Sequence, residues 1–408
     1  IVGKYVGEQA LAAVGTSTPI MNIAILLISG MCMGASVLMS SQYGAKDYDT
    51  LSRQISTTML AGCGFSVVFS LLMLLLANPV LRLIRVPETA IPEAAAYLRI
   101  IFMGLIFTFM YNFLANTMRA LGDSKTPLYF LVTSAFLNIF GDLFFVVVLR
   151  WGVAGSAIAT VCSEGLCCLL CGIYIKKKIP LLCLGKKWWV FDKSLLGKTV
   201  SYGSTSAMQQ VCLQLGKLII QSVVNTQGVA VMAAFTAVNR VDDFAYTPQQ
   251  NIGHAMTTFL AQNKGAGHKE RMKKGFQTGL LIELVYSVGL FCVIWGLAPQ
   301  IMTLFAEDGD AQVVSLGISY LHLISWMYIL PGLTNGVQGF FRGIGDLKVT
   351  LYSTFMNMFG RVVAVFVMIR LLQMEFASLA WANMVGWIVM LLFEVPLLVK
   401  SMRNGECG

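Results

Sequence analysis

Charge is scarce in this sequence. Asp, Glu, Lys and Arg together supply 12% of the 408 residues, whereas they supply about 25% of a typical soluble domain. Hydrophobic residues supply 57%, and the mean hydropathy of the chain is +0.73. This composition excludes a soluble globular domain and predicts an integral membrane protein, in which lipid surrounds most of the apolar side chains.

The signatures of several functional classes are also missing. The chain has no HExxH helix, no GxSxG turn and no Walker lysine, so an intramembrane enzyme is not expected. It has neither a ring of pore charges nor a repeated filter motif, which a channel would need for ion selectivity. We therefore expect a protein without catalytic residues and without a cofactor.

A cysteine-based metal site is not expected either. Zinc sites favour CxxC pairs held in turns or histidine partners, and the apolar run that carries four of the ten cysteines contains no histidine. We interpret these cysteines as small, reduced packing residues. The four are Cys162, Cys167, Cys168 and Cys171.

Long apolar runs fill most of the chain. A membrane-spanning helix needs about 20 apolar residues, and eleven runs reach that length after a stub at the N-terminus. Because the sequence begins at Ile1 without a signal-peptide pattern, we expect that most of a first helix is missing from it. The predicted fold class is all-α integral membrane, with spans at 11–42, 51–76, 93–118, 126–149, 152–175, 195–224, 229–262, 275–296, 312–340, 349–370 and 377–399.

Basic residues concentrate in alternate loops. Most of the 29 Lys and Arg residues fall on one side of the predicted membrane, which the positive-inside rule identifies as the cytoplasmic side. The net charge of +9 therefore reflects the membrane topology, and no nucleic-acid partner is expected. The basic loops contain Lys46, Arg53, Arg119, Lys125, the basic residues of 176–198 and 264–274, Arg342, Lys348, Lys400 and Arg403.

The second half of the sequence repeats the first. Arg119-Ala-Leu-Gly-Asp-Ser-Lys125 recurs as Arg342-Gly-Ile-Gly-Asp-Leu-Lys348, and Phe136-Leu-Asn-Ile-Phe-Gly141 recurs as Phe355-Met-Asn-Met-Phe-Gly360. Six spans per copy mean that both copies enter the membrane from the same side, as two six-helix bundles related by a pseudo-twofold axis along the membrane normal. We predict an N-terminal bundle over 1–175, a basic cytoplasmic linker over 176–194 and a C-terminal bundle over 195–408.

A carboxylate lies inside the predicted span 126–149. Asn138 and Asp142 are four residues apart and share one face of a helix. Thr160 and Glu164 have the same spacing in the next span, at a similar depth. A charge at this depth costs at least roughly 2.5 kcal/mol, so an intramembrane Asp is a functional candidate. We predict that Asn138, Asp142 and Thr160 bind a cation, with Glu164 as a candidate relay; a purely structural hydrogen bond of Asp142 is the alternative.

The two copies differ at this position, because Asp142 aligns with Arg361. We therefore infer one cation site, in the first half. In the second half, Arg240 is close enough along one helix to pair with Asp242 or Asp243 in a neutralised structural cluster, and direct substrate contact is the alternative. The predicted lining of a substrate cavity is Asn112, Gln209, Gln210, Asp242, Asp243 and Arg361.

These features together resemble the multidrug and toxic compound extrusion (MATE) family of prokaryotic transporters. The resemblance covers the whole chain and rests on the parallel six-helix repeat and on the order of its motifs. Those motifs are Ala10-Leu-Ala-Ala-Val-Gly15, Arg119-Ala-Leu-Gly-Asp123, Asn138-xxx-Asp142, Gly152-Val-Ala-Gly-Ser-Ala-Ile-Ala-Thr160 and Gln262-Asn-Lys-Gly-Ala266.

The resemblance implies two bundles around a central cavity and an antiporter that exports amphipathic, often cationic compounds in exchange for protons or sodium ions. The family's cation site uses an Asn and an Asp one turn apart and a Thr on the next helix, which match Asn138, Asp142 and Thr160. Its further Asp in the first helix would precede Ile1. Some members carry an acidic residue in the seventh helix, where this sequence has Gln209 and Gln210, so a second cation site is not expected there.

We expect alternating access by the two bundles, biased by the charge on Asp142. The expected partners are amphipathic small molecules and the lipid bilayer, and the expected working form is a monomer. A lipid-linked oligosaccharide flippase remains the alternative, because such proteins can share this duplicated bundle; they tend to carry several basic residues in the cavity, and the first half offers few. The sequence does not distinguish protons from sodium ions, since carboxylate, amide and hydroxyl oxygens suit either.

Overall fold

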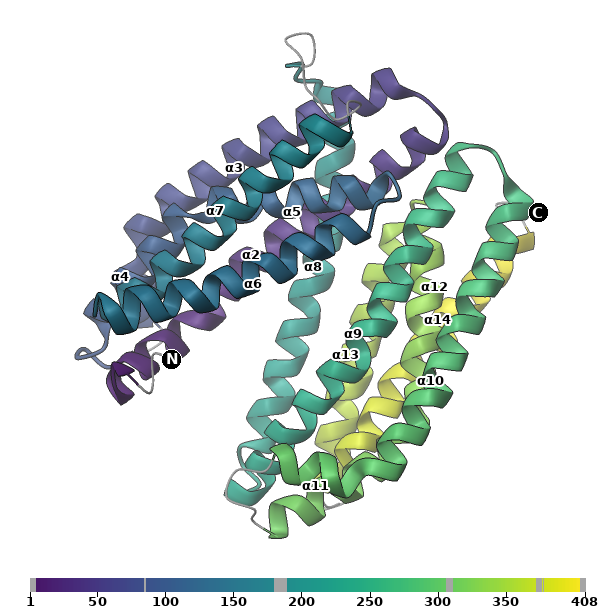
Figure 1. Ribbon diagram of the computed structural model, residues 1–408. Helices are drawn as coiled ribbons and strands as arrows, with labels where there is room; N and C mark the ends of the chain where they lie inside the picture. Colours follow the sequence, from purple (N-terminus) through teal and green to yellow (C-terminus); the bar gives the residue numbers. More distant parts are fainter. Residues whose placement is uncertain are drawn as a thin grey trace. The chain divides into compact units, whose positions relative to one another are not determined.

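The computed structural model describes residues 5–83, 86–179, 189–305, 311–371, 376 and 378–403. All regular structure in these ranges is helical, and the chain divides into two compact units, Ile1–Ala207 and Met208–Gly408 (Figure 1). The border between the units lies within one helix, after the predicted linker 176–194. Residues 180–188 of that linker lie outside the described ranges, so the limits 1–175 and 195–408 stay predictions.

The first unit consists of long helices joined by short turns. One of its spans, between residues 91 and 120, bends by 45° where a glycine separates two helices. The helices are α2 (Glu8–Gly44), α3 (Tyr48–Leu83), α4 (Ile91–Met103), α5 (Leu105–Ala120), α6 (Lys125–Asp142), the π-helix η1 (Leu143–Val148), α7 (Gly152–Lys178) and the beginning of α8 (Lys193–Val224).

The second unit has the same order of helices after the end of α8. The span between residues 311 and 343 is again interrupted, here by a short 3₁₀ segment just before Pro331, which has no N–H to donate to the preceding turn. The helices are α9 (Val229–Gly265), α10 (Lys269–Phe305), α11 (Ala311–Ser325), the 3₁₀ segment η5 (Trp326–Tyr328), α12 (Ile329–Gly343), α13 (Leu347–Phe366), the π-helix η6 (Val367–Leu371) and α14 (Ser378–Arg403).

Matching backbone irregularities confirm the predicted repeat. The Gly of the Arg-x-x-Gly-Asp turn has a positive φ in both copies, 95° at Gly122 and 85° at Gly345, a conformation that glycine adopts without strain. In the first copy the carboxylate of Asp123 accepts a hydrogen bond of 3.0 Å from the Thr126 N–H at the start of α6. Both α6 and α13 continue into a π-helical segment. The motif is therefore a turn that starts the next span.

The position of Arg342 in the structure differs from the one predicted from the sequence. The sequence predicts Arg342 in a basic loop on the cytoplasmic side, and the loop assignment is wrong, because Arg342 belongs to the last turn of α12 and is 4% exposed. α12 packs against both α9 and α14, so that even its final turn is covered by neighbouring helices.

The helices account for all eleven predicted spans. Eight described helical stretches are long and apolar enough to cross a membrane, and the bent pair α4 and α5 makes a ninth. The remaining two, α8 and α9, have 32 and 37 residues and are more polar than the others. Several of their polar residues contribute to the lining of a cavity described below.

Close packing of glycines joins the beginning of α8 to the first unit. A Cβ atom at Gly34 of α2 would lie 2.5 Å from the backbone nitrogen of Gly203 and 2.6 Å from the carbonyl oxygen of Tyr202. One at Gly30 would lie 2.5 Å from Cα of Ala207. Since these neighbours are backbone atoms, α2 and α8 can approach this closely only because glycine has no side chain.

We expect Gly34→Ala to destabilise the first unit by about 1–3 kcal/mol or more, because backbone atoms of α8 must shift to admit the methyl group. The measurement is the free energy of unfolding in mixed detergent micelles, and the matched control is Gly64→Ala, whose added Cβ would meet no atom within 4 Å. Equal stability of the two variants would show that α8 does not pack on α2 in this way.

Candidate functional site

The first unit brings together two of the residues predicted to bind a cation. Asn138 of α6 donates a hydrogen bond from Nδ2 to Oγ1 of Thr160 on α7, with a distance of 3.1 Å. The Thr160 hydroxyl in turn donates to the backbone carbonyl of Ser156, at 3.1 Å. Because the amide uses its nitrogen for Thr160, its oxygen is free to face another ligand.

The carboxylate of Asp142 lies one turn beyond Asn138, half-buried at the end of α6. Its Oδ1 atom is buried and has no hydrogen-bond partner among the described residues. The hydroxyl of Ser156 is its polar neighbour on α7. Sequence reasoning missed Ser156, although Ser156, Thr160 and Glu164 follow one another at four-residue intervals and therefore form one polar stripe along α7.

Small residues let α6 and α7 meet beside this carboxylate. A Cβ atom at Gly141 would lie 3.0 Å from Cβ of Ala159, and one at Gly155 would lie 3.0 Å from the carbonyl oxygen of Phe145. The helix then widens into η1 directly after Asp142. π-helical segments of this kind occur frequently at functional sites.

Glu164 lies one turn along α7 from Thr160, and Thr108 of α5 donates its hydroxyl hydrogen bond to the Glu164 carboxylate. The hydroxyl of Tyr97 on α4 interacts electrostatically with both Asp142 and Glu164. Tyr97 is 5% exposed, so the two carboxylates face the same interior region of the first unit. This placement agrees with the predicted proximity of the two acids.

The donor atoms of this cluster are all oxygens: the carboxylates of Asp142 and Glu164, the amide oxygen of Asn138, and the hydroxyls of Thr160 and Ser156. Oxygen ligands of this kind suit hard cations and protons, and they do not suit soft metals that prefer thiolate ligands. The arrangement can therefore hold a proton or a small cation. The assignment of individual residues to that cation stays a prediction.

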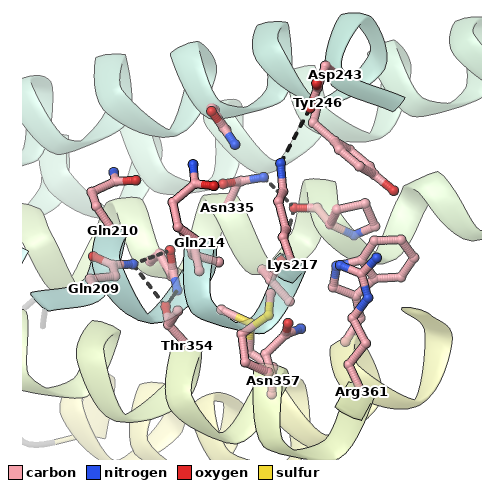
Figure 2. Close-up of a pocket in the computed structure, with 18 of the residues that line it drawn as sticks. Gln209, Gln210, Gln214, Lys217, Asp243, Tyr246, Asn335, Thr354, Asn357 and Arg361 are labelled. Carbon is pink, nitrogen blue, oxygen red and sulfur yellow. Dashed lines mark hydrogen bonds and ion pairs between the residues drawn. The ribbon is translucent and has the colours of Figure 1, made fainter. Parts of the chain in front are cut away.

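The second unit contains a polar cavity with a volume of about 310 Å³. Figure 2 shows Gln209, Gln210, Gln214 and Lys217 of α8 on one side of it, with Asn357 and Arg361 of α13 below. Four of the predicted cavity residues line it. The complete lining is Gln209, Gln210, Leu213, Gln214, Lys217, Asp243, Tyr246, Thr247, Gln250, Pro331, Thr334, Asn335, Gln338, Thr354, Asn357, Met358, Arg361, Trp387 and Met390.

Side-chain amides fix one wall of the cavity. Gln209 donates from Nε2 to the amide oxygen of Gln338 at 3.2 Å and to the hydroxyl of Thr354 at 3.0 Å. Gln338 also donates to Thr354, at 3.1 Å. The three side chains come from α8, α12 and α13, so this network ties together the helices that surround the cavity.

The charges of the cavity are two cations and one acid. Lys217 pairs with Asp243 at 3.4 Å, with both side chains more than half exposed, and Figure 2 draws this pair at the top of the cavity. Arg361 keeps a buried Nε without a hydrogen-bond partner in the described part of the chain. The cavity therefore offers several hydrogen-bond donors and acceptors together with a modest positive charge.

Two of the predicted cavity residues lie elsewhere. Asp242 is 4% exposed and accepts hydrogen bonds from the hydroxyls of Tyr328, at 2.6 Å, and Tyr320, at 3.1 Å. Asn112 belongs to the first unit, where its amide donates to the carbonyl of Thr108 at 2.9 Å. Neither residue lines the cavity of the second unit.

The predicted pairing of Arg240 with Asp242 or Asp243 is wrong. Arg240 is exposed and takes part in none of the ion pairs among the described residues. Asp243 pairs with Lys217 of α8 instead, and Asp242 is held by two tyrosines. Spacing along one helix placed the charges near one another, but the neighbouring helices supply the actual partners.

Comparisons with known proteins agree with this architecture. The family model described as MatE matches residues 1–144 and 206–368. The probable multidrug resistance protein YpnP of Bacillus subtilis is 31% identical over 353 residues, which cover 86% of this chain and 78% of that protein. The probable multidrug resistance protein YoeA of the same organism is 29% identical over 367 residues, covering 88% of this chain and 78% of YoeA.

Solved structures show the same fold. An outward-facing multidrug resistance MATE transporter of the MOP superfamily superimposes with a TM-score of 0.90 at 21% identity, covering 98% of this chain and 89% of that one. A MATE protein in the straight conformation gives a TM-score of 0.91 at 20% identity, covering 99% and 91%. With the family match, these findings show that the chain is a multi-pass membrane transporter, rather than an enzyme, and belongs to the multidrug and toxic compound extrusion (MATE) family.

Proposed function

We propose that this protein is an antiporter that exports amphipathic organic compounds in exchange for protons or sodium ions. The observation that carries the proposal is the half-buried carboxylate of Asp142, with one unpartnered oxygen, one turn from the hydrogen-bonded pair of Asn138 and Thr160. A carboxylate at this position in a membrane helix is costly unless it holds a proton or a cation. It is therefore suited to exchange that cation between two aqueous phases.

The mechanism that we propose is alternating access biased by the charge of Asp142. The ionised carboxylate favours the state in which it meets external water, and its neutral or cation-bound form permits the other packing. Coupling requires only that the cation bind the two states with different affinity. A tenfold cation gradient supplies about 1.4 kcal/mol, and a potential of 100 mV adds about 2.3 kcal/mol per charge.

The cavity of the second unit is our candidate for substrate contact. Its amides can accept or donate hydrogen bonds to many compounds, and Tyr246 and Trp387 add apolar surface. A cationic compound, which we expect as substrate, would compete with Lys217 for the carboxylate of Asp243. The names of YpnP and YoeA, both probable multidrug resistance proteins, support this broad class of substrate. We propose a monomer that needs no organic cofactor.

The test is transport of a fluorescent amphipathic cation by the purified protein in sealed vesicles. We expect dye movement against its own gradient when a proton gradient or a sodium gradient is imposed, and only slow equilibration when both are absent. The gradient that drives movement identifies the coupling ion. Transport that is equally fast without either gradient would contradict an antiporter.

A further inference from the structure

A second buried carboxylate lies in the other unit, away from the lining of the cavity. Glu283 is near the middle of α10, roughly 21 Å from the first residue of that helix at 1.5 Å per residue. Its side chain is 1% exposed, and neither carboxylate oxygen has a hydrogen-bond partner among the described residues. It also takes part in none of the ion pairs there.

Three polar side chains converge beside this carboxylate at Gly332 of α12. A Cβ atom at Gly332 would lie 2.9 Å from Oγ of Ser287, 3.3 Å from Nε2 of Gln249 and 3.4 Å from Oε2 of Glu283. Gln249 is 0% exposed and Ser287 is 3% exposed. The glycine leaves this polar space open, because any side chain at position 332 would enter it.

The hydrogen bonds fix the orientation of Gln249. Its Nε2 donates to the Tyr328 carbonyl at 2.9 Å and to the Ser287 hydroxyl at 3.1 Å. The reversed amide would place its oxygen against that carbonyl oxygen, so this orientation is required. The remaining amide oxygen, Oε1, is buried and has no donor in the described part of the chain.

The Ser287 hydroxyl already uses its hydrogen, because Oγ lies 2.7 Å from the carbonyl oxygen of Glu283. It therefore cannot satisfy the Glu283 carboxylate as well. The titratable neighbour of that carboxylate is Tyr286, whose hydroxyl donates to the carbonyl of Ala245 at 3.2 Å. The space beside Gly332 therefore contains more buried acceptor oxygens than hydrogen-bond donors that could satisfy them.

We propose that Glu283 is the centre of a second cation site, which takes a proton or a sodium ion with Gln249, Ser287 and the Tyr328 carbonyl as neighbouring oxygen donors. An unpaired carboxylate without hydrogen bonds is strongly disfavoured at this depth. A single carboxylate neutralises a monovalent cation, whereas a divalent ion would leave a buried positive charge. The donor set contains only oxygens, as hard cations prefer.

Tyr328 connects this site to the cavity of the second unit. Its carbonyl faces Gln249 and Ser287, while its hydroxyl donates to Asp242. Asp242 interacts electrostatically with Arg361, which lines the cavity. Cation binding at Glu283 can therefore alter the cavity through Tyr328 and Asp242. Only this coupling rests on the proposed antiporter function; the binding of a cation does not.

The first experiment counts cations on the purified protein in detergent, using equilibrium binding of radioactive sodium ions and the infrared band of protonated carboxyl groups. The variants are Glu283→Gln, Asp142→Asn and both together, with Glu270→Gln at the exposed start of α10 as the matched control. We expect Glu283→Gln to lose one sodium equivalent or one titrating carboxyl band, the double variant to lose two, and the control to lose none.

The outcomes separate this proposal from the proposed function. If Glu283→Gln loses its cation and Asp142→Asn does not, the second site stands and the role of Asp142 fails. If Glu283→Gln binds as many cations as the unchanged protein, the second site is refuted. It is also refuted if the carboxyl band that Glu283→Gln removes is present in the unchanged protein at every pH and is insensitive to sodium.

A steric test avoids changing any ligand. We expect Gly332→Ala to weaken sodium binding or shift the titration at the second site, because the new methyl group would enter the space beside Ser287 and Glu283. Gly289→Ala is the control, since its Cβ would meet no atom within 4 Å. Thermal unfolding confirms that both variants are folded, and unchanged cation binding by a folded Gly332→Ala would refute the site.

Discussion

Asp142→Asn is expected to reduce the rate of gradient-driven efflux at least about tenfold, which corresponds to a barrier to transport that is higher by ~1.4 kcal/mol or more. Asn has nearly the same shape as Asp but can neither take up a proton nor neutralise a sodium ion. The hydrogen bond between Asn138 and Thr160 does not involve Asp142 and should persist. The measurement is dye transport in vesicles under the gradient that drives the unchanged protein.

Two controls make this result specific. Asp49→Asn removes an exposed acid on α3 that pairs with Arg53, and it should transport as well as the unchanged protein. Glu164→Gln tests whether the second acid near Tyr97 contributes, as predicted for a relay. If Asp142→Asn is folded and still moves dye against its gradient at full rate, Asp142 has only a structural role.

Arg342→Met is expected to destabilise the second unit by about 1–3 kcal/mol, because it removes a buried guanidinium that donates a hydrogen bond to the Gln338 carbonyl and acts electrostatically on the buried acid Glu394. Arg342 of α12 is 4% exposed, and Glu394 of α14, with which it interacts electrostatically, is 0% exposed. Arg342 also donates from Nε to the carbonyl of Gln338, at 3.3 Å. Glu394→Gln should be costly as well, since a buried guanidinium cannot shed its proton.

The double variant Arg342→Met with Glu394→Gln is expected to be more stable than the sum of the single changes by about 1–3 kcal/mol, because it leaves no unpaired charge. The measurement is the free energy of unfolding in mixed detergent micelles. The exposed pair of Arg53 and Asp49 serves as control: its atoms are 2.9 Å apart, yet Arg53→Met should cost about 1 kcal/mol or less. Strict additivity of the two buried substitutions would refute the interaction.

The spans and the repeat could be predicted because they depend on local patterns. Apolar runs of membrane-spanning length and the repeated Arg-x-x-Gly-Asp turn can be read directly from the amino-acid sequence, and the structure has a helix for each run. The meeting of Asn138 and Thr160 followed from equal depth on two consecutive helices joined by a short turn. Contacts between consecutive helices of this kind can be predicted without knowing how the other helices pack.

Partners on non-consecutive helices could not be predicted. Asp242 of α9 is held by Tyr320 of α11 and Tyr328 of η5, and the neighbourhood of Glu283 combines α9, α10 and α12. The predicted span 312–340 ends two residues before Arg342, and nothing in the sequence says that α12 continues past this residue or which of its faces turns toward α14. Burial of a charge is decided by these contacts between distant segments.

The repeated turn also sets the depth of two charges within their own units. Seventeen residues separate Lys125 from Asp142, but only thirteen separate Lys348 from Arg361. Four residues are close to one helical turn of 3.6, so Arg361 keeps nearly the azimuth of Asp142 while lying roughly 6 Å nearer the start of its helix. The two copies therefore place these residues on nearly the same face of the helix but at different distances from its start. Exchanging the two side chains would not exchange the two environments.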